Sequence, residues 1–195
     1  MSPGIFKQDM RNTKRLFLAV DLPEELKDRL HEVQREWSHF PARWVRRNIL
    51  HVTFAFLGEV EEKNLPSLMD ALAGVLKAHP LTLTVEDIQY GPDKRRPRLI
   101  WARTKESQEL TSLYEALLAR LKALPFKVYL AYKRPAHITL ARFNNLNLRG
   151  WEEDELPFVE QKIDYTFTVS AIELIESKLR RGGPEYFVLH SFILS

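Results

Sequence analysis

The sequence predicts an α+β protein with a mainly antiparallel sheet and helices packed outside it. Three observations support this class. A tetrapeptide of the form His-x-Thr-x occurs twice, each copy lies in an apolar run rich in β-branched residues, and the segments around the two copies follow the same order. Strand hairpins mixed with strand–helix–strand units are typical of α+β domains.

In the first half, a strand, a helix and a His-x-Thr-x strand follow one another. The apolar segment 15–22 predicts a strand. The segment 23–37 predicts a helix, because Pro23 suits the first helical position, two glutamates fill the first turn and apolar residues recur at helical spacing. The strand that contains His51 comes next.

The second half repeats this order. The segment 98–104 predicts a strand, and 108–124 predicts a helix with leucines on one face. The strand that contains His137 follows at nearly the same spacing as in the first half. This duplication predicts two pseudo-symmetric lobes related by a twofold axis, which would bring the two motifs face to face.

The remaining segments complete a single domain. The other predicted elements are a helix over 61–78, strands over 81–90, 126–132, 166–176 and 186–194, and irregular connections over 91–97 and 144–162. Residues 1–14 are charged and polar, which predicts a flexible N-terminal tail, so residues 15–195 are expected to form one bilobal domain.

The composition fits a compact protein. With 195 residues, of which 45% are hydrophobic, the chain can bury a sizeable core. No run approaches the roughly 20 apolar residues of a membrane span, and residues 1–13 lack the apolar core of a secretory signal. Cysteine is absent, which excludes disulfides and thiol catalysis. We expect a cytoplasmic monomer.

The side chains of each motif separate onto two faces of its strand. Successive residues of a strand point to opposite sides, so His51 and Thr53 point one way and their apolar neighbours the other. The same holds for His137 and Thr139. If the two strands are neighbours, their polar faces combine two imidazoles and two hydroxyls in one site suited to a phosphodiester. The simpler alternative is two half-buried strands whose polar residues face water.

Basic and aromatic residues cluster near both motifs. The net charge is only +3, but arginines and lysines gather just before His51, around His137 and in two further turns. Positive clusters beside a phosphate-handling site favour an anionic polymer or nucleotide. Trp44 and Tyr132 are candidate surfaces for stacking bases. The alternative is that these clusters are solvated turns.

Three segments resemble a known family. Residues 15–23 (RLFLAVDLP), 48–60 (NILHVTFAFLGEV) and 137–142 (HITLAR) resemble the RNA 2′,3′-cyclic phosphodiesterases, also called the 2′-5′ RNA ligase family, of the two-histidine phosphoesterase superfamily. The resemblance implies two lobes around a central groove. It also implies that the site residues are His51, Thr53, His137, Thr139 and Arg142.

The motif residues suit hydrolysis of a 2′,3′-cyclic phosphate. One imidazole would take a proton from water, the other would protonate the leaving ribose oxygen, and the threonine hydroxyls with Arg142 would bind the phosphate oxygens. By resemblance the product is a 2′-phosphate. We favour His137 as base and His51 as acid. Neither motif has a carboxylate or a third histidine at metal-ligand spacing, so we expect no metal and no cofactor.

Two other functions remain open. The same site run in reverse would make a 2′-5′ RNA ligase, and the sequence does not separate the two directions. A non-catalytic RNA-binding module is the second alternative, although binding alone would need arginine and lysine more than paired imidazoles. The expected partner in each case is RNA or a nucleotide.

Overall fold

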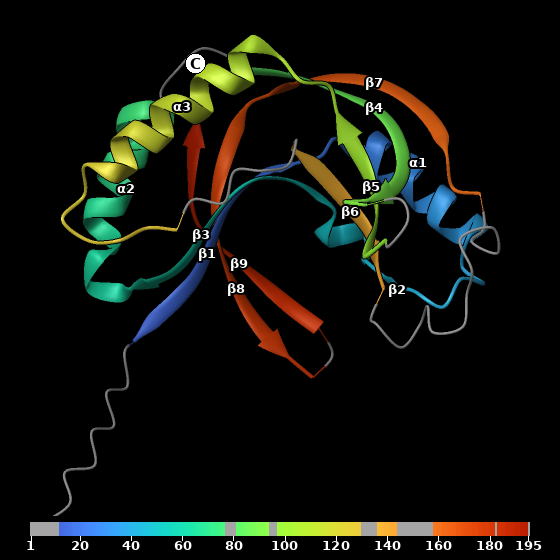
Figure 1. Cartoon of the computed structure of the whole chain (residues 1–195), viewed down its shortest axis with the longest axis horizontal. Helices are drawn as coiled ribbons and strands as arrows, with labels where there is room; N and C mark the ends of the chain where they lie inside the picture. The colour runs from blue at the N-terminus through green and yellow to red at the C-terminus, as the bar shows by residue number, and fades with distance from the viewer. Residues whose placement is uncertain are drawn as a thin grey trace, which may run out of the picture.

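The computed structural model describes residues 12–76, 81–93, 97–129, 136–143, 158–181 and 183–194. Within these ranges the chain forms a nine-stranded sheet and three α-helices (Figure 1). The elements in chain order are β1 (Thr13–Asp21), α1 (Glu24–Glu36), β2 (Arg43–Trp44), the 3₁₀ helix η1 (Arg47–Ile49), β3 (His51–Glu61), the 3₁₀ helix η2 (Glu62–Asn64), α2 (Leu65–Leu76), β4 (Leu81–Gly91), β5 (Leu99–Thr104), α3 (Gln108–Lys122), β6 (His137–Arg142), β7 (Gln161–Val169), β8 (Ala171–Arg180) and β9 (Gly183–Ile193).

The order of the strands is symmetric about the centre of the sheet. It runs β7-β4-β5-β6-β3-β1-β8-β9, with the short β2 also paired to β6. Every pair within this path is antiparallel. The two motif strands, β6 and β3, lie in the middle, and each is flanked by the first strand of its own repeat, β5 or β1. The predicted α+β class is therefore confirmed, with the two related halves joined into one antiparallel sheet.

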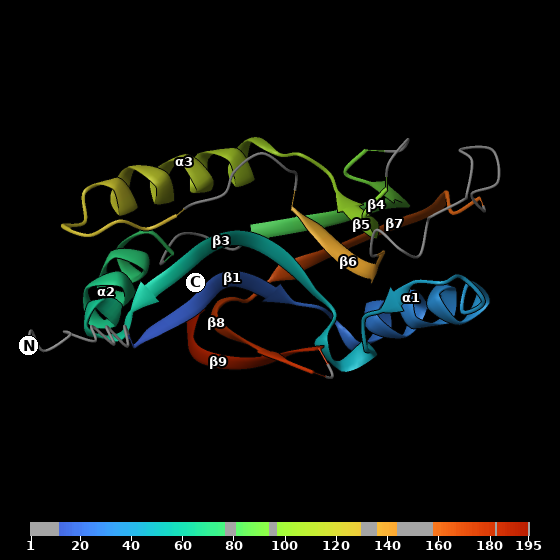
Figure 2. The same cartoon turned by 60° about the horizontal axis from the view of Figure 1, so that its bottom comes forward.

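The helices cover one face of this sheet. In both views α2 and α3 lie side by side at one end of the molecule and α1 lies at the other (Figures 1 and 2). Buried residues of all three helices join Leu18, Val52 and Ile138 from the central strands in one continuous hydrophobic core. Since side chains alternate along a strand, the residues next to these point to the opposite face of the sheet.

Most predicted elements agree with the structure to within two residues at each end. The helix expected over 61–78 is shorter, because Glu61 still belongs to β3 and η2 follows before α2 begins at Leu65. Pro66 has no N–H to donate, so it is compatible with the first turn of α2 and not with an earlier helix start. The two-residue strand β2 was not predicted.

The C-terminal third corrects the prediction. The prediction of one strand over 166–176 is wrong, because this segment contains parts of two strands. β7 ends at Val169 and β8 begins at Ala171, with Ser170 between them. At this point the chain leaves its partner β4 and joins β1, without a glycine or proline to mark the change. Of the expected strand 126–132, residues 126–129 are irregular and the rest lies outside the described residues. Of the expected tail 1–14, Thr13 and Lys14 belong to β1, and residues 1–11 lie outside the described residues.

Candidate active site

The two His-x-Thr-x motifs meet at the centre of the sheet. His51 opens β3 and His137 opens β6, and Thr53 lies directly opposite His137 in the ladder between these strands. Directly opposed residues of an antiparallel pair point to the same face. His51, Thr53, His137 and Thr139 therefore share one face, and the Cα atoms of the two histidines, as diagonal neighbours, are about 7–8 Å apart.

The hydrogen bonds of His51 define which of its nitrogens faces the site. Its Nδ1 lies 2.8 Å from the carbonyl oxygen of Ile49. A carbonyl only accepts, so Nδ1 carries a hydrogen and donates it. Nε2 is then the nitrogen available for proton exchange with a ligand, and the Thr53 hydroxyl lies 3.2 Å from it.

The surroundings of His51 favour its neutral form in the absence of a ligand. Burial is the largest influence and lowers the pKa of the imidazole below its ordinary value of 6.5. Arg142 lowers the pKa further, while the hydrogen bond to Ile49 and the charge of Asp21 act in the opposite direction. An anion placed among these groups would raise the pKa of His51, because it would stabilise the imidazolium.

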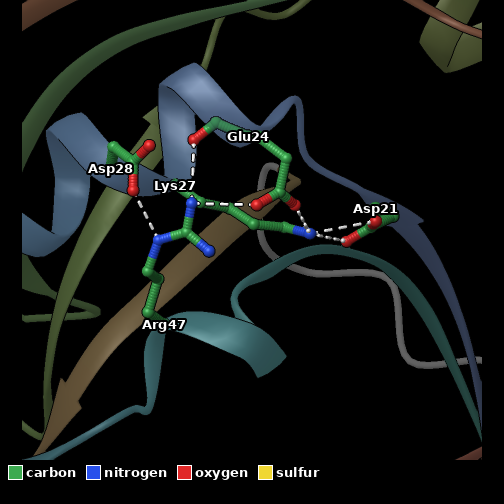
Figure 3. Close-up of polar contacts among 5 residues, drawn as sticks. All are labelled: Asp21, Glu24, Lys27, Asp28 and Arg47. Carbon is green, nitrogen blue, oxygen red and sulfur yellow. Dashed lines mark hydrogen bonds and ion pairs between the residues drawn. The ribbon is translucent and has the colours of Figure 1, made fainter.

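The 3₁₀ helix η1 is tied to α1, and this tie supports the orientation of His51. Arg47 of η1 donates to Asp28 at 2.6 Å and to Glu24 at 2.9 Å, both on α1 (Figure 3). Ile49, which accepts the Nδ1 hydrogen of His51, lies in the same turn of η1. The position of the imidazole thus depends on how α1 holds this turn.

Lys27 connects the same helix to the strand beside His51. Its side chain is 7% exposed and its ammonium lies 2.9 Å from both Asp21 and Glu24 (Figure 3). Asp21 ends β1 and is the direct cross-strand partner of His51. The first turn of α1 is therefore fixed against the end of β1, next to the face that carries the two motifs.

Aromatic rings pack against both histidines. Phe17 of β1 and Tyr186 of β9 lie with their ring centroids 5.2 and 5.3 Å from that of His51. Trp101 of β5 lies 4.6 Å from His137. These contacts restrict the rotation of both imidazoles and exclude water from one side of each ring, which supports pre-organisation of a catalytic site.

A bulge in β6 brings Arg142 to the same face. The ladder with β5 slips by one residue at Leu140, which is the extra residue of a β-bulge. Leu140 and Ala141 are consequently both fully buried in the core, and Arg142 is exposed. Because of this extra residue, the Arg142 side chain points to the same face as Thr139. The positive charge of Arg142 acts on His51 and lowers its pKa.

The two histidines have neighbours of opposite charge. The direct cross-strand partner of His51 in β1 is Asp21, and that of His137 in β5 is Arg103. Arg103 in turn pairs with Asp87 through bonds of 2.9 and 2.5 Å. The Asp21 carboxylate favours an imidazolium at His51, and the Arg142 guanidinium opposes it. The cross-strand partners of the two histidines therefore differ in the sign of their charge.

Comparison with known proteins identifies the family. A family model described as LigT like Phosphoesterase matches residues 20–101. The RNA 2′,3′-cyclic phosphodiesterase of Thermotoga maritima is 30% identical over 183 residues, which cover 90% of this chain and 93% of that protein. The chain belongs to the LigT-like phosphoesterase family.

Solved structures agree with this assignment of a LigT-like phosphoesterase. A Thermus thermophilus protein is 29% identical and superposes with a TM-score of 0.77, covering 92% of this chain and 97% of its own. Escherichia coli LigT complexed with 3′-AMP is 26% identical with a TM-score of 0.69, covering 94% and 99%. The predicted family and the prediction of a phosphoesterase-class enzyme are confirmed.

The other predicted site residues of this LigT-like phosphoesterase lie differently. Trp44 is half-buried and packs against the hydrophobic core, and its strand partner Ala141 is also part of that core. The structure thus does not bring Trp44 to the face of the histidines. Tyr132 lies outside the described residues.

Several residues of the LigT-like site were missed by sequence reasoning. The sequence contains a pattern that could have identified Phe17. The uninterrupted apolar run of β1 predicts a strand buried on both faces, so its residues on the face of the histidines are also covered. Trp101 lies in a predicted strand and is buried, with its ring packed against His137. Tyr186 had no signal, since its contact with His51 depends on the neighbouring β8–β9 hairpin.

The donor groups of the site do not form an evident metal centre. In the part of the chain that the structure describes, no group of three or more His, Asp or Glu side chains is arranged to hold a metal ion.

No helix in the described ranges has the length and apolar character needed to span a membrane.

Proposed function

We propose that this protein hydrolyses the 2′,3′-cyclic phosphate of RNA ends or nucleosides to a 2′-phosphate without a metal ion. The observation that carries the proposal is the pairing of Thr53 with His137, which puts both motifs on one face of the sheet. Relatives named as RNA 2′,3′-cyclic phosphodiesterases and a LigT structure with 3′-AMP support a nucleotide substrate. The absence of cysteine is compatible with the expected cytoplasmic location.

The reaction needs one base and one acid on opposite sides of phosphorus. The base takes a proton from water as the water oxygen bonds to phosphorus, and the acid gives a proton to O3′ as the P–O3′ bond breaks. The products are a 2′-phosphate and a free 3′-hydroxyl. Two histidines whose Cα atoms lie about 7–8 Å apart can bracket a single phosphate between their imidazoles, and each such role contributes about 10²–10⁴-fold in rate.

We assign the base to His137 and the acid to His51. Asp21, the cross-strand partner of His51, supports this order because its charge favours the protonated form that an acid needs, although Arg142 acts on the same ring in the opposite direction. Without ligand, His51 is mostly neutral near pH 7, so the negative charge of the bound phosphodiester provides the protonation. Thr53, Thr139 and Arg142 donate to the non-bridging oxygens, on which charge grows in the transition state.

The direct test is incubation with a nucleoside 2′,3′-cyclic phosphate in EDTA, with the product identified by phosphorus NMR. We expect the 2′-monophosphate only, and loss of turnover of at least about 10²-fold in both His51→Ala and His137→Ala. Retention of near-normal turnover by either variant would remove that histidine from the mechanism. Loss of activity in EDTA, restored by a divalent metal, would contradict metal independence.

A substrate with sulfur in place of O3′ distinguishes the acid from the base. A thiolate leaves without protonation, so it should restore turnover to a variant that lacks the acid but not to one that lacks the base. We expect rescue of His51→Ala and not of His137→Ala. The opposite pattern would reverse the assignment.

The two alternatives are outcomes of the same assay. A ligase would join the cyclic phosphate to an added 5′-hydroxyl RNA through a 2′-5′ bond, by the same proton transfers with the 5′-hydroxyl in place of water, and would release the 3′-hydroxyl. A non-catalytic RNA-binding module would bind the substrate and leave it intact. The pairing of two imidazoles with two hydroxyls on one buried face favours turnover over binding alone.

A further inference from the structure

The tip of the β8–β9 hairpin closes on Arg43. Gly183 is buried at the start of β9 with φ +120°, a backbone conformation that favours glycine. A Cβ at this position would collide with the guanidinium of Arg43. The absence of a side chain at Gly183 therefore allows the hairpin to pack directly against Arg43 of β2.

Arg43 and Arg142 lie side by side on the ladder between β2 and β6. They are direct cross-strand partners, and two like charges in that position destabilise a sheet. The bulge at Leu140 turns Arg142 toward the histidines, and the same register puts Arg43 on that face. Two guanidiniums placed beside a phosphate site favour the binding of a second anion.

Tyr186 faces the same group of charges from the hairpin. Its ring packs on His51 and Phe17, which places it at the border between the catalytic pair and the arginines. Burial raises the pKa of its hydroxyl, and the charges of Arg142, Arg15 and Arg43 oppose this rise. Arg15 precedes Phe17 by two residues on β1 and so lies on the same face of the strand. The charges of three guanidiniums from three different strands therefore act on one phenol.

We propose that Arg43, Arg15 and the Tyr186 hydroxyl form a second anion site, which binds the phosphate on the 5′ side of the terminal nucleotide. The inference rests on the proposed function and specifies its substrate class. Arg142 and the two histidines hold the reacting cyclic phosphate, and the neighbouring phosphate of an RNA chain lies one nucleotide away. The site thereby favours RNA ends and 5′-phosphorylated nucleotides over nucleosides without a 5′-phosphate.

The test compares adenosine 2′,3′-cyclic phosphate with and without a 5′-phosphate. We expect wild-type kcat/KM to be about ten- to a hundred-fold higher for the 5′-phosphorylated form, as for one charge-assisted hydrogen-bonded contact. Arg43→Gln should bring this ratio close to one. Arg181→Gln is the matched control, since it removes an exposed arginine from the same hairpin turn, and it should keep the wild-type ratio.

A binding measurement separates this inference from the proposed function. Calorimetry of the wild type and Arg43→Gln with 2′-AMP and adenosine 2′,5′-bisphosphate needs no turnover. We expect Arg43→Gln to lose the preference for the bisphosphate. An unchanged preference in Arg43→Gln, or an equal loss in Arg181→Gln, would overturn the second anion site. Failure to hydrolyse any cyclic nucleotide would instead overturn the proposed function, while the affinities would still decide the anion site.

Discussion

At the scale of single residues, we expect His51 to couple ligand binding to protonation. Its pKa lies below 6.5 without ligand, chiefly because the ring is buried. A bound phosphate adds negative charge next to Nε2 and raises that pKa. At a pH between the pKa of His51 in the free protein and its pKa in the complex, the complex holds more protons than the free protein. Binding of 2′-AMP near pH 6.5 should therefore be accompanied by proton uptake, on the order of one or less per site.

Calorimetry in buffers of different ionisation enthalpy measures this uptake. The measured binding enthalpy of the wild type should depend on the buffer, and the dependence should weaken in His51→Gln and toward alkaline pH. The pKa of the 2′-phosphate itself contributes to the uptake, so the difference between the two proteins is the informative quantity. Equal uptake by both would contradict a role for His51 in the linkage.

At the scale of elements, the close packing of β4 against β5 holds the ring of Trp101 against His137. A Cβ on Gly91 of β4 would overlap the indole of Trp101, whose ring packs on His137. Gly91→Ala should therefore displace Trp101, destabilise the fold by about 1–3 kcal/mol and lower kcat. Urea unfolding and steady-state kinetics check the two effects.

Gly74 of α2 is the matched control for Gly91. A Cβ there meets only Arg120 Nε, at 4.0 Å. Gly74→Ala should stabilise the helix by about 0.5–1 kcal/mol and leave kcat unchanged. If both alanine variants behaved alike, the close approach of β4 to Trp101 would have no functional consequence.

Some features of the elements follow from local sequence patterns, and others depend on how the strands pair. The strand–helix–strand repeat and the shared face of each motif follow from periodicity within single segments. The bulge at Leu140 and the break at Ser170 depend on the strands to which each segment pairs, and no glycine or proline marks them. Arg142 was therefore predicted only through family resemblance, and Tyr186 was not predicted.

At the scale of the whole molecule, the proposed active site coincides with the junction between the two halves. The motif strands β3 and β6 form that junction, and the pairing of Thr53 with His137 is part of it. Residues of both halves share one continuous core, which includes Leu18, Val52 and Ile138. The halves should therefore unfold together, because neither can leave the junction without exposing apolar surface of the other.

Urea unfolding followed by far-UV circular dichroism and by tryptophan fluorescence tests this expectation. Of the four tryptophans, Trp37 and Trp44 report on the first half and Trp101 on the second, so one cooperative transition should appear with the same midpoint by both signals. Because 2′-AMP would contact both halves, a concentration of about 100 times its Kd should stabilise that single transition by about 2.7 kcal/mol. Two separate transitions, or stabilisation of only one of them, would show that the halves are independent and that the site does not depend on their junction.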